Sequence, residues 1–392
     1  MTSIVILSAV RTAIGDFGGA LKGHAPTKLG ALVGAEAIRR AGIAPDDIGH
    51  AVYGNVIHTE PADMYLARVA AMGAGVPAST PALTVNRLCG SGLQAIVSAA
   101  QTIALGDATT ALAGGAESMS RSGHLLSSVR WGQKMGGTAA VDMMLGALND
   151  PFGNGHMGIT AENVAAAHGI GREAQDRFAA ESHRRAALAI AGGRFRDQIL
   201  PIEVADRKGT RLFDTDEHVR ADVDEASLAA LKPAFKRDGS VTAGNASGIN
   251  DGAAALVLME AAEASRRGLK PMARIVAWGH AGVDPGVMGI GPVPATRRAL
   301  DRAGLTVVDL DVVESNEAFA SQACAVSAEL GLPADRVNPN GGAIALGHHV
   351  GASGAIIATK LVHELHRTGG RFGLATMCIG GGQGIALIVE RI

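Results

Sequence analysis

The chain carries an internal repeat. Residues 37–48, AIRRAGIAPDDI, align with residues 299–310, ALDRAGLTVVDL, through a shared Arg-Ala-Gly and matching aliphatic positions. The same spacing, without a gap, places Ser91-Gly92 on Ser353-Gly354. Two matches at one spacing indicate a duplicated unit, so the fold is expected to contain two similar halves.

Near the ends of the two halves, the number of residues that separates matching segments is smaller. Residues 252–260, GAAALVLME, resemble residues 384–390, GIALIVE, so the first half carries about 130 extra residues between about Ser118 and Asn250. We predict a first half at 1–118 plus 250–270 and a second half at 271–392. Residues 119–249 are then an inserted loop domain, which we expect to cap a site.

Each half alternates segments typical of strands and helices. VILSA, AVYGNV, ALTV and TALAGG are short apolar runs, whereas KLGALVGAEAIRRAG and GLQAIVSAAQTIALG have apolar residues at helical spacing and end in glycine. The insertion contains one clear polar helix, REAQDRFAAESHRRAALAIAGG. Continuous apolar strands are typical of mainly parallel sheets covered by helices on both faces, so the sequence predicts an α/β fold.

Composition limits the class of partner. The 392 residues have a formal net charge of −2 without a basic run, and no continuous apolar run reaches the ~18 residues of a membrane span. We therefore expect a small-molecule partner, with no nucleic acid and no membrane. Three cysteines without CxxC spacing, and a start without a recognisable leader, favour reduced thiols and a cytoplasmic protein.

Cys89 lies in VNRLCGSGLQAI, between an apparent strand and a glycine-flanked helix start. The positive end of a helix dipole lowers the pKa of a thiol, so Cys89 is a candidate nucleophile; the alternative is a small buried apolar residue. In the repeat, Gly351 is the counterpart of Cys89, and His348 is the counterpart of Asn86. Approximate two-fold symmetry would bring both helix starts together and give Cys89 a base.

Two further stretches carry polar groups at strand ends. TMCIGGGQG places Cys378 before glycines whose N–H groups can face an oxyanion, and VVESNEAFASQ places Asn316 where its amide can hold a water or a carbonyl. Cys324, in the apolar helix that follows, is interpreted as core packing. We expect no metal, because no cluster has ligand spacing, and GGGQG lacks both the dinucleotide pattern and the P-loop lysine.

Together, CGSGLQAI, NEAFA, NGGAIALGH with GASG, and CIGGGQG resemble the thiolase family, in its acetyl-CoA acetyltransferase or β-ketothiolase branch. The resemblance covers essentially the whole chain. It implies the thiolase fold, in which duplicated βαβαβαββ halves stack as five α-β-α-β-α layers with a loop domain inserted in the first half.

The resemblance also implies a reversible Claisen condensation. Cys89, activated by His348, would take the acyl group of an acyl-CoA and release CoA. Cys378 would remove an α-proton from acetyl-CoA, and the carbanion would take the acyl group to give a 3-oxoacyl-CoA. The enolate oxygen would face His348 and a water on Asn316, and the tetrahedral intermediate would face the N–H groups of Cys89 and Gly380.

For CoA and the acyl group, the resemblance points to His156, Met157, Arg220, Ser247, Met288 and Phe319. Arg220 would face a CoA phosphate, whereas Met157 and Met288 would line the acyl slot. CoA and acyl-CoA would be substrates, with no permanently bound cofactor. The family resemblance also implies a homotetramer, a dimer of dimers, with RSGHLLSSVRWGQKMGG as the assembly loop.

One position departs from the family pattern. Most members have proline after the catalytic histidine, but this chain has His349, and losing proline relaxes the loop. Neighbours in an extended segment point in opposite directions, so only one of the two histidines can face Cys89, and we assign His348 to that role.

The leading hypothesis is an active β-ketothiolase for short-chain 3-oxoacyl-CoAs, with medium-chain substrates left open. One alternative is a thiolase-fold acyl-CoA-binding protein whose turnover His349 impairs. A decarboxylating ketosynthase is disfavoured by the second cysteine in CIGGGQG, and a dehydrogenase by the missing dinucleotide motif.

Overall fold

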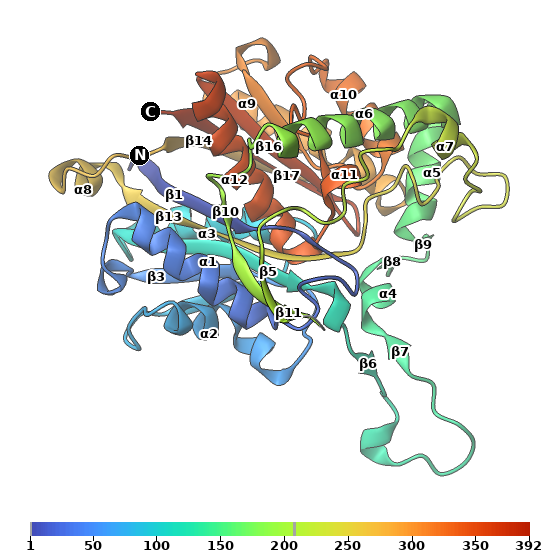
Figure 1. Ribbon diagram of the computed structural model, residues 1–392, viewed down its shortest axis with the longest axis horizontal. Coiled ribbons are helices and arrows are strands. Elements are labelled where there is room, and N and C mark those ends of the chain that lie inside the picture. The colour runs from blue at the N-terminus through green and yellow to red at the C-terminus, as the bar shows by residue number, and fades with distance from the viewer. Residues whose placement is uncertain (1, 207–208) are drawn as a thin grey trace.

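The computed structural model describes residues 2–206 and 209–392. Its central feature is an eleven-stranded sheet in the order β15-β16-β17-β14-β1-β13-β5-β3-β4, to which β10 and β2 add beside β1 and β13 (Figure 1). The strands on the main path are β1 (Ile4–Thr12), β3 (His50–Gly54), β4 (Ala82–Val85), β5 (Thr110–Ser118), β13 (Asn250–Glu260), β14 (Ala273–Gly282), β15 (Val312–Ser315), β16 (Phe372–Ile379) and β17 (Gln383–Arg391). The two added strands are β2 (Gly15–Asp16) and β10 (Ile199–Leu200).

The sheet consists of two halves with the same strand order. The first runs β4-β3-β5-β13-β1, and the second runs β15-β16-β17-β14, with an isolated bridge between Val313 and Val337 beyond β15. The halves join edge to edge, where Val5 of β1 pairs with Arg274 of β14 and the next residue continues the pairing. The duplication in the sequence therefore appears as a repeated strand order.

The strand directions correct one expectation, because the sheet is mixed and not mainly parallel. β3 pairs in parallel with β4 and β5, and β15 pairs in parallel with β16. β13 runs antiparallel to β5 and β1, and β17 runs antiparallel to β16 and β14. The apolar runs reflect helices on both faces of the sheet, whatever the strand direction.

Helices form three layers around the two half-sheets (Figure 1). α1 (Pro26–Ala41) and α2 (Leu66–Gly73) cover the outer side of the first half, and α9 (Pro292–Ala303) and α10 (Ala320–Leu330) cover that of the second. α3 (Ser91–Leu105) and α12 (Val350–Thr368) lie between the halves. The expected five-layer α-β-α-β-α arrangement is confirmed.

The two central helices approach so closely that backbone meets backbone. A Cβ atom added at Gly92 would lie 2.5 Å from the amide nitrogen of Ala355, and one added at Gly354 would meet the amide nitrogen of Leu93. Gly354 and Ala355 are the repeat counterparts of Gly92 and Leu93, so the contact is reciprocal, as two-fold symmetry requires. Glycine is needed here for the close approach.

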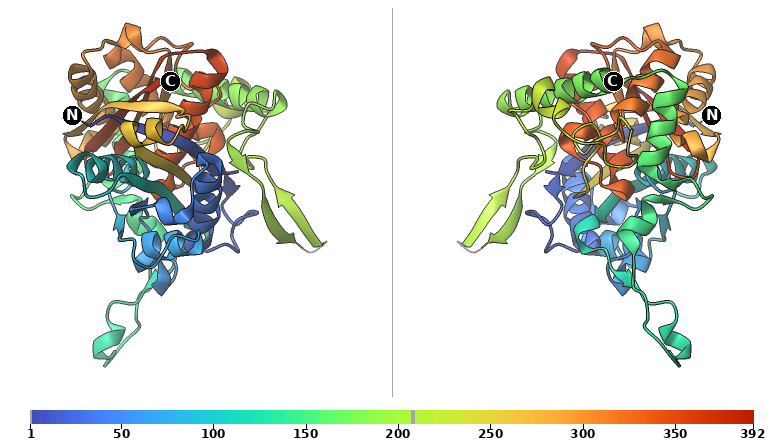
Figure 2. Two further views of the ribbon diagram at one scale, coloured as in Figure 1. Left: turned by 90° about the vertical axis from the view of Figure 1, so that its left-hand side faces the viewer. Right: turned by 90° about the vertical axis from the view of Figure 1, so that its right-hand side faces the viewer.

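The insertion supplies helices over the second half and two projections. α6 (Arg172–Ala191) confirms the polar helix expected from the sequence. The insertion also contains the shorter helices α4 (Met143–Ala147), α5 (Met157–Ala167) and α7 (Glu225–Ala229). Two further short helices, α8 (Ala261–Arg266) and α11 (Ala343–Leu346), lie outside the insertion. The hairpin of β11 (Ile202–Asp206) and β12 (Gly209–Phe213) projects from the body (Figure 2). So does the arm, residues 122–142, which contains β6 (His124–Leu125) and β7 (Val141–Asp142). β8 (Asn149–Asp150) and β9 (Gly155–His156) pair with each other where the chain returns from the arm to the body (Figure 1).

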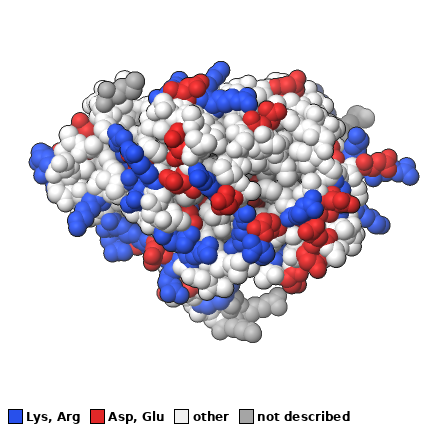
Figure 3. Space-filling model, turned by 90° about the horizontal axis from the view of Figure 1, so that it is seen from above, with Lys and Arg blue, Asp and Glu red and all other residues white. Residues whose placement is uncertain are grey.

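Two properties bear on the class of partner. One helical stretch, Leu88–Leu105, is long and apolar enough to cross a membrane by length and composition alone, with a mean hydropathy of 1.3. It contains α3, the central helix packed between the half-sheets, and such core helices commonly meet that criterion. On the face shown in Figure 3, Lys and Arg side chains are interspersed with Asp and Glu.

Candidate active site

Most of the predicted site residues line one cavity of about 230 Å³. Nine of the eleven lie there: Cys89, His156, Met157, Ser247, Met288, Phe319, His348, Cys378 and Gly380. They come from both halves and from the insertion. The repeat therefore brings the start of α3 and the start of α12 to one place, as the symmetry argument predicted, and the end of β16 lies at the same cavity.

Cys89 lies in a tight turn just before α3. Leu88, the preceding residue, has a φ of 45°, a left-handed conformation that is uncommon for a residue with a branched side chain. Ser91 holds the turn, because its hydroxyl donates to the carbonyl oxygen of Leu88 at 2.6 Å and accepts from the N–H of Arg87 at 2.9 Å. Backbone strain of this kind is typical of functional sites.

The electrostatics of Cys89 differ from the sequence expectation of a lowered pKa. Burial raises the pKa of the Cys89 thiol, while the backbone N–H groups of Gly380 and of Cys89 itself act in the opposite direction. Desolvation outweighs the helix end because the thiolate loses its water before any substrate supplies a compensating charge. The resting nucleophile is therefore a thiol that needs a base.

His348 is held by hydrogen bonds that leave one ring nitrogen free for chemistry. Its backbone N–H donates to the side-chain oxygen of Asn250 at 3.0 Å, and its Nδ1 lies 2.7 Å from Oγ of Ser353. Ser353 also donates to the carbonyl oxygen of His349 at 3.1 Å. Because the hydroxyl proton of Ser353 is donated to that carbonyl, Oγ of Ser353 accepts a hydrogen bond from Nδ1–H of His348. Nε2 of His348 therefore carries a lone pair that can take a proton.

The protonation state of His348 fits a base. Burial lowers the pKa of His348 to about 4, so the ring is neutral near pH 7. Its Nε2 is buried without a hydrogen-bond partner within the described residues, and the residue lines the same cavity as Cys89. A neutral imidazole and a neutral thiol together can transfer a proton as the thiol attacks.

Cys378 ends the strand β16 and lies in the apolar part of the cavity. It packs in a cluster with Met157, Met288 and Phe319. Burial raises its pKa well above that of an ordinary thiol, and the neighbouring Cys89 raises it further. The two thiols are therefore coupled, because ionisation of either one makes ionisation of the other less favourable.

The inserted segment supplies the outer wall of the cavity. Nδ1 of His156 accepts from the N–H of Gly158 at 3.0 Å and caps α5, while its ring stacks on Phe235 with centroids 4.7 Å apart. Ser247 is fixed by a 3.0 Å hydrogen bond from its N–H to the carbonyl oxygen of Ala318. The hydrogen bond of Ser247 ties the insertion to the NEAFA loop.

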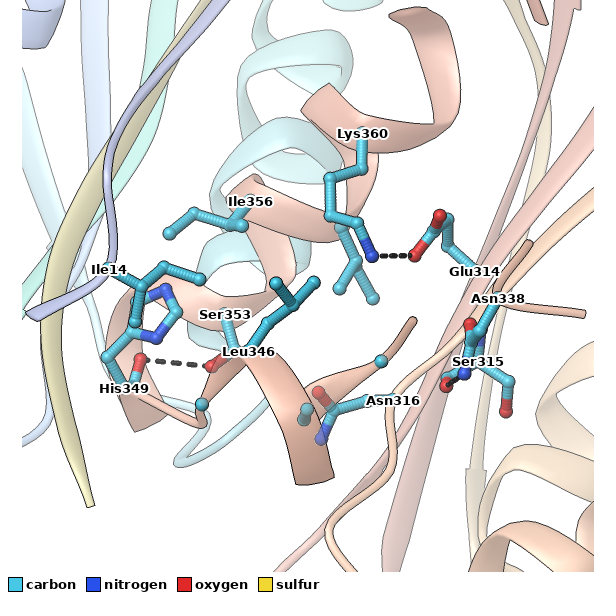
Figure 4. Close-up of a pocket in the computed structure, with 14 residues that line it drawn as sticks. Ile14, Glu314, Ser315, Asn316, Asn338, Leu346, His349, Ser353, Ile356 and Lys360 are labelled. Atoms are coloured by element: carbon cyan, nitrogen blue, oxygen red, sulfur yellow. Dashed lines mark hydrogen bonds and ion pairs between the residues drawn. The ribbon is translucent and has the colours of Figure 1, made fainter. Parts of the chain in front are cut away.

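Two predicted residues lie outside this cavity. Arg220 is exposed, and its backbone N–H donates to Nδ1 of His183 at 3.2 Å, so a role at a CoA phosphate remains a prediction. Asn316 directly follows β15 and lines a smaller neighbouring cavity, together with His349 (Figure 4). His349 does not line the cavity that contains Cys89 and His348.

Several residues at the site were not singled out from the sequence. Asn250 and Ser353 hold His348, Phe235 stacks on His156, and Glu117 accepts hydrogen bonds from the N–H groups of Val56, Ile57 and Gly351. For Ser353 a signal existed, because its repeat counterpart Ser91 holds the turn at Cys89. For Asn250, Phe235 and Glu117 the contacts are long-range, and no local pattern marks them.

Throughout residues 2–206 and 209–392, no group of three or more His, Cys, Asp or Glu side chains is arranged to hold a metal ion. His363 of α12 is partly buried, with its Nε2 2.9 Å from the carbonyl oxygen of Ala9. The ring fills a gap between α12 and β1. All three cysteines are unpaired.

Comparisons with known proteins agree with this arrangement. Family models described as "Thiolase, N-terminal domain" and "Thiolase, C-terminal domain" match residues 4–262 and 269–391. The beta-ketothiolase BktB of Cupriavidus necator is 64% identical over 390 residues, covering 99% of this chain and 99% of its own. An acetyl-CoA acetyltransferase of Chromobacterium violaceum is 53% identical over 390 residues, with the same shares of both chains.

Solved structures give the same result for the fold. The human mitochondrial 3-ketoacyl-CoA thiolase matches with a TM-score of 0.98 and 43% identity, over 100% of this chain and 99% of its own. A second structure of that enzyme, in complex with CoA, matches with a TM-score of 0.97 and 42% identity, and the match covers 100% of this chain and 98% of that chain. The Bacillus anthracis acetyl-CoA acetyltransferase matches with a TM-score of 0.97 and 46% identity, and the match covers 100% of this chain and 99% of that chain.

Proposed function

The chain belongs to the thiolase family and is an acyltransferase of the β-ketothiolase and acetyl-CoA acetyltransferase kind, and we propose that it works through an acyl-enzyme on Cys89. The observation that carries the proposal is the shared cavity. Cys89, His348, Cys378 and Gly380 line it together, although they come from sequence positions almost 300 residues apart. The substrates are CoA and acyl-CoA thioesters, and the chemistry needs no further cofactor.

In the first half-reaction, Nε2 of His348 takes the proton of Cys89 as the sulfur attacks the thioester carbon of an acyl-CoA. The tetrahedral oxyanion accepts hydrogen bonds from the N–H groups of Cys89 and Gly380, and each such donor is worth about 2.7–4 kcal/mol at the transition state. The intermediate expels the CoA thiolate, which takes the proton from His348. The products are CoA and an acyl group on Cys89.

In the second half-reaction, Cys378 passes its proton to Nε2 of His348, which the first half-reaction has left neutral, and the Cys378 thiolate removes an α-proton from acetyl-CoA. Burial is the main cause of the raised pKa of Cys378, and the acylated Cys89 adds no negative charge that would raise it further. The carbanion attacks the acyl carbon, and the sulfur of Cys89 leaves. The proton released at the start returns to Cys89, and the product is a 3-oxoacyl-CoA.

The enolate oxygen formed in this step needs its own donors. We assign them to His348 and to a water held by Asn316, which directly follows β15 in the NEAFA loop. His156, Met157, Ser247, Met288 and Phe319 form the walls that would enclose the pantetheine and acyl groups. The apolar cluster around Cys378 favours short-chain acyl groups, with the sulfur-containing side chains of Met157 and Met288 closing the slot.

The test is CoA-dependent cleavage of acetoacetyl-CoA and 3-oxohexanoyl-CoA, for the native chain and for Cys89→Ser and Cys378→Ser. An active native chain, with activity lowered about 10³-fold or more in both variants, would support the two-thiol mechanism. The reason is that a serine hydroxyl ionises much less readily than a cysteine thiol and so replaces it poorly as nucleophile or base. Mass spectrometry of the protein mixed with acetyl-CoA would place the acyl group on Cys89. A native chain that cleaves neither substrate, or a Cys89→Ser variant that stays active, would overturn the proposal.

The alternative of an acyl-CoA-binding protein impaired by His349 finds no support in the comparisons. It predicts a native chain that binds CoA without cleaving either substrate, so the same assay separates it from the mechanism above. His349→Pro is the informative variant in that case, because it restores the residue that the family resemblance leads us to expect.

We further propose a homotetramer assembled through the arm. The arm gathers several exposed large apolar side chains on one projecting segment, among them Trp131, which is 85% exposed, and Met135, which is 88% exposed. Exposed apolar side chains on a projecting loop are typical of an interface between subunits. The three unpaired cysteines further support a reducing compartment, the cytoplasm, as the place of action.

A further inference from the structure

Glu117 is a buried carboxyl that the mechanism above does not use. It lies near the end of β5, is 0% exposed, and does not line the catalytic cavity. A buried charge is costly unless hydrogen bonds replace the water that it has lost. The hydrogen-bond partners of Glu117 therefore decide which role this carboxyl can have.

Four hydrogen-bond donors surround the two carboxyl oxygens of Glu117. Oε1 accepts from the carboxamide of Asn55 at 3.0 Å and from the N–H of Ile57 at 3.2 Å. Oε2 accepts from the N–H of Val56 at 3.0 Å and from the N–H of Gly351 at 2.8 Å. Three of these donors belong to the loop after β3, and the fourth belongs to the first turn of α12. Glu117 therefore joins these two segments.

The ionised form of Glu117 is the form that fits these partners. All four partners donate, and a carboxylate can accept two hydrogen bonds on each oxygen, whereas a protonated carboxyl or a carboxamide would turn a hydrogen toward one of the donors. Burial raises the pKa of this carboxyl, but its three backbone N–H partners act in the opposite direction. The start of α12 also favours a negative charge, because the first turn of this helix contains no acidic residue of its own.

The repeat shows that this contact exists in one half only. At the spacing of the repeat, Ile379 of β16 is the counterpart of Glu117, and the parallel pairs β3–β5 and β15–β16 keep the same register. A Cβ atom on Gly351 would collide with Oε2 of Glu117, so this position cannot carry the side chain that its counterpart Cys89 carries. A Cβ atom on Gly90, at the start of α3, would lie 2.5 Å from Cδ1 of Ile379. An apolar residue therefore lies beside the helix start that serves the substrate, and an acid lies beside the equivalent start of α12.

Both segments that Glu117 joins reach the catalytic cavity. Val56, one of the donors, lines this cavity, and so does the first residue of α12. His348 precedes that helix by two residues, and its Nδ1 lies 2.7 Å from Oγ of Ser353 in the first turn. A shift of the first turn of α12 would therefore move the contact that orients the ring of His348.

We propose that Glu117 is a positioning residue for His348: its carboxylate holds the first turn of α12 against the loop after β3, so that Nε2 of His348 stays within reach of the thiol of Cys89. This role deepens the function proposed above and rests on it. The walls assigned to CoA come from the insertion and the NEAFA loop, whereas the partners of Glu117 lie in the loop after β3 and in α12. Loss of the carboxylate therefore slows proton transfer and leaves CoA binding unchanged.

The first test compares crystal structures of the native chain and of Glu117→Gln. The carboxamide keeps the shape of the side chain, but its NH₂ group faces N–H donors and cannot accept from them. We expect the first turn of α12 to move away from the loop after β3, and the hydrogen bond between Nδ1 of His348 and Oγ of Ser353 to lengthen beyond about 3.5 Å. A variant in which this hydrogen bond keeps its native length would overturn the proposal. This test does not depend on activity, so it stands even if the proposed function fails.

The second test measures kcat and KM for the cleavage of acetoacetyl-CoA in three variants. Glu117→Gln removes the charge, Asn55→Leu removes one of the four donors, and Glu364→Gln is the matched control at another buried carboxyl of α12. Glu364 pairs with Arg367 at 2.6 Å and lies about 20 Å along the helix from Gly351. Circular dichroism and the midpoint of urea unfolding show whether each variant folds. Asn55→Leu keeps the test decisive if Glu117→Gln does not fold.

We expect Glu117→Gln to lower kcat by about 100-fold, the effect of a displacement of about 1 Å at a reacting group, with KM changed by less than about 3-fold. Asn55→Leu should lower kcat by about 10-fold, which corresponds to one hydrogen bond to a charged group. Glu364→Gln should change neither constant.

A double variant separates positioning of His348 from a general loss of structure. Ser353→Ala removes the partner of the His348 ring, so adding it to Glu117→Gln should cost little more than the more severe single change. Losses that multiply, a kcat unchanged in Asn55→Leu or in a folded Glu117→Gln, or a KM that rises at unchanged kcat would contradict the proposal. A native chain that does not acylate Cys89 would instead overturn the function proposed above.

Discussion

Gly92 and Gly354 occupy equivalent positions in the two repeats, and each lies against the backbone of the other's helix. This reciprocal contact sets the distance between α3 and α12, and with it the distance between the turn that carries Cys89 and the loop that carries His348. The catalytic geometry therefore depends on two residues that have no side chain.

Gly354→Ala should destabilise the protein by about 3 kcal/mol or more, because the new methyl group meets the backbone nitrogen of Leu93, which cannot move without displacing α3. The measurement is the midpoint of urea unfolding. Gly146→Ala is the matched control, since this helical glycine has no atom within 4 Å of an added Cβ, and alanine there should be neutral or slightly stabilising. Equal midpoints for the two variants would show that the helices can separate without cost.

The acylation half-reaction should have a broad pH plateau. Burial lowers the pKa of His348 to about 4, so the imidazole gains a proton and stops acting as a base only as the pH falls through about 4. Burial raises the pKa of Cys89, so the thiol stays protonated through the range where a free thiol begins to ionise near pH 8.5. Both neutral forms therefore coexist from about pH 5 to about pH 8.

The measurement is the rate of Cys89 acylation by acetyl-CoA across that range, with circular dichroism to confirm that the protein stays folded. A rate that falls steeply below pH 6.5 would mean an ordinary histidine pKa. A maximum near neutral pH would indicate a thiolate–imidazolium pair in the resting enzyme, which the burial of both groups disfavours.

Met288→Ala should shift acyl selectivity toward longer chains. Met288 is buried in the apolar cluster around Cys378, and its removal opens room for about two or three methylene groups. One methylene in such a pocket is worth about 1–3 kcal/mol, so the ratio of kcat/KM for 3-oxohexanoyl-CoA over acetoacetyl-CoA should rise about 10-fold or more. Met72→Ala, on the exposed side of α2, should leave the ratio unchanged. A ratio that does not move in Met288→Ala would place the acyl slot elsewhere.

The double variant Trp131→Asp with Met135→Asp should convert a tetramer into dimers, because two buried carboxylates without partners would oppose burial of the arm in an interface. Light scattering coupled to size-exclusion chromatography measures the mass. Val308→Asp is the control, since Val308 is 77% exposed on the body of the protein and away from the arm. A native chain that is already dimeric, or a double variant that remains tetrameric, would contradict the arm as the assembly element.

Much of the site could be predicted because its residues stand next to the ends of strands and helices. Cys89 precedes a helix, Cys378 ends a strand, and Asn316 follows one, so each is recognisable from local patterning. The pairing of Cys89 with His348 came from the repeat, because two-fold symmetry brings equivalent positions together. These predictions required no knowledge of distances.

Other features depended on packing between distant segments. The sequence indicated mainly parallel strands, but β13 and β17 run antiparallel, since an apolar run shows burial and not direction. The pKa of Cys89 was expected to be lowered by the helix end, yet burial raises it. The enclosure of His349 behind the loop, with Asn316 in the same small cavity, could not be read from neighbouring residues.

The sequence by itself determined the duplication, the strand and helix segments, and the residue types that carry the chemistry, because periodicity and motifs are local. Only the tertiary structure decided which polar groups lose their water and which partners replace it. Desolvation depends on every segment that packs around a group, and for Cys89, His348 and His349 those segments are far apart in the chain.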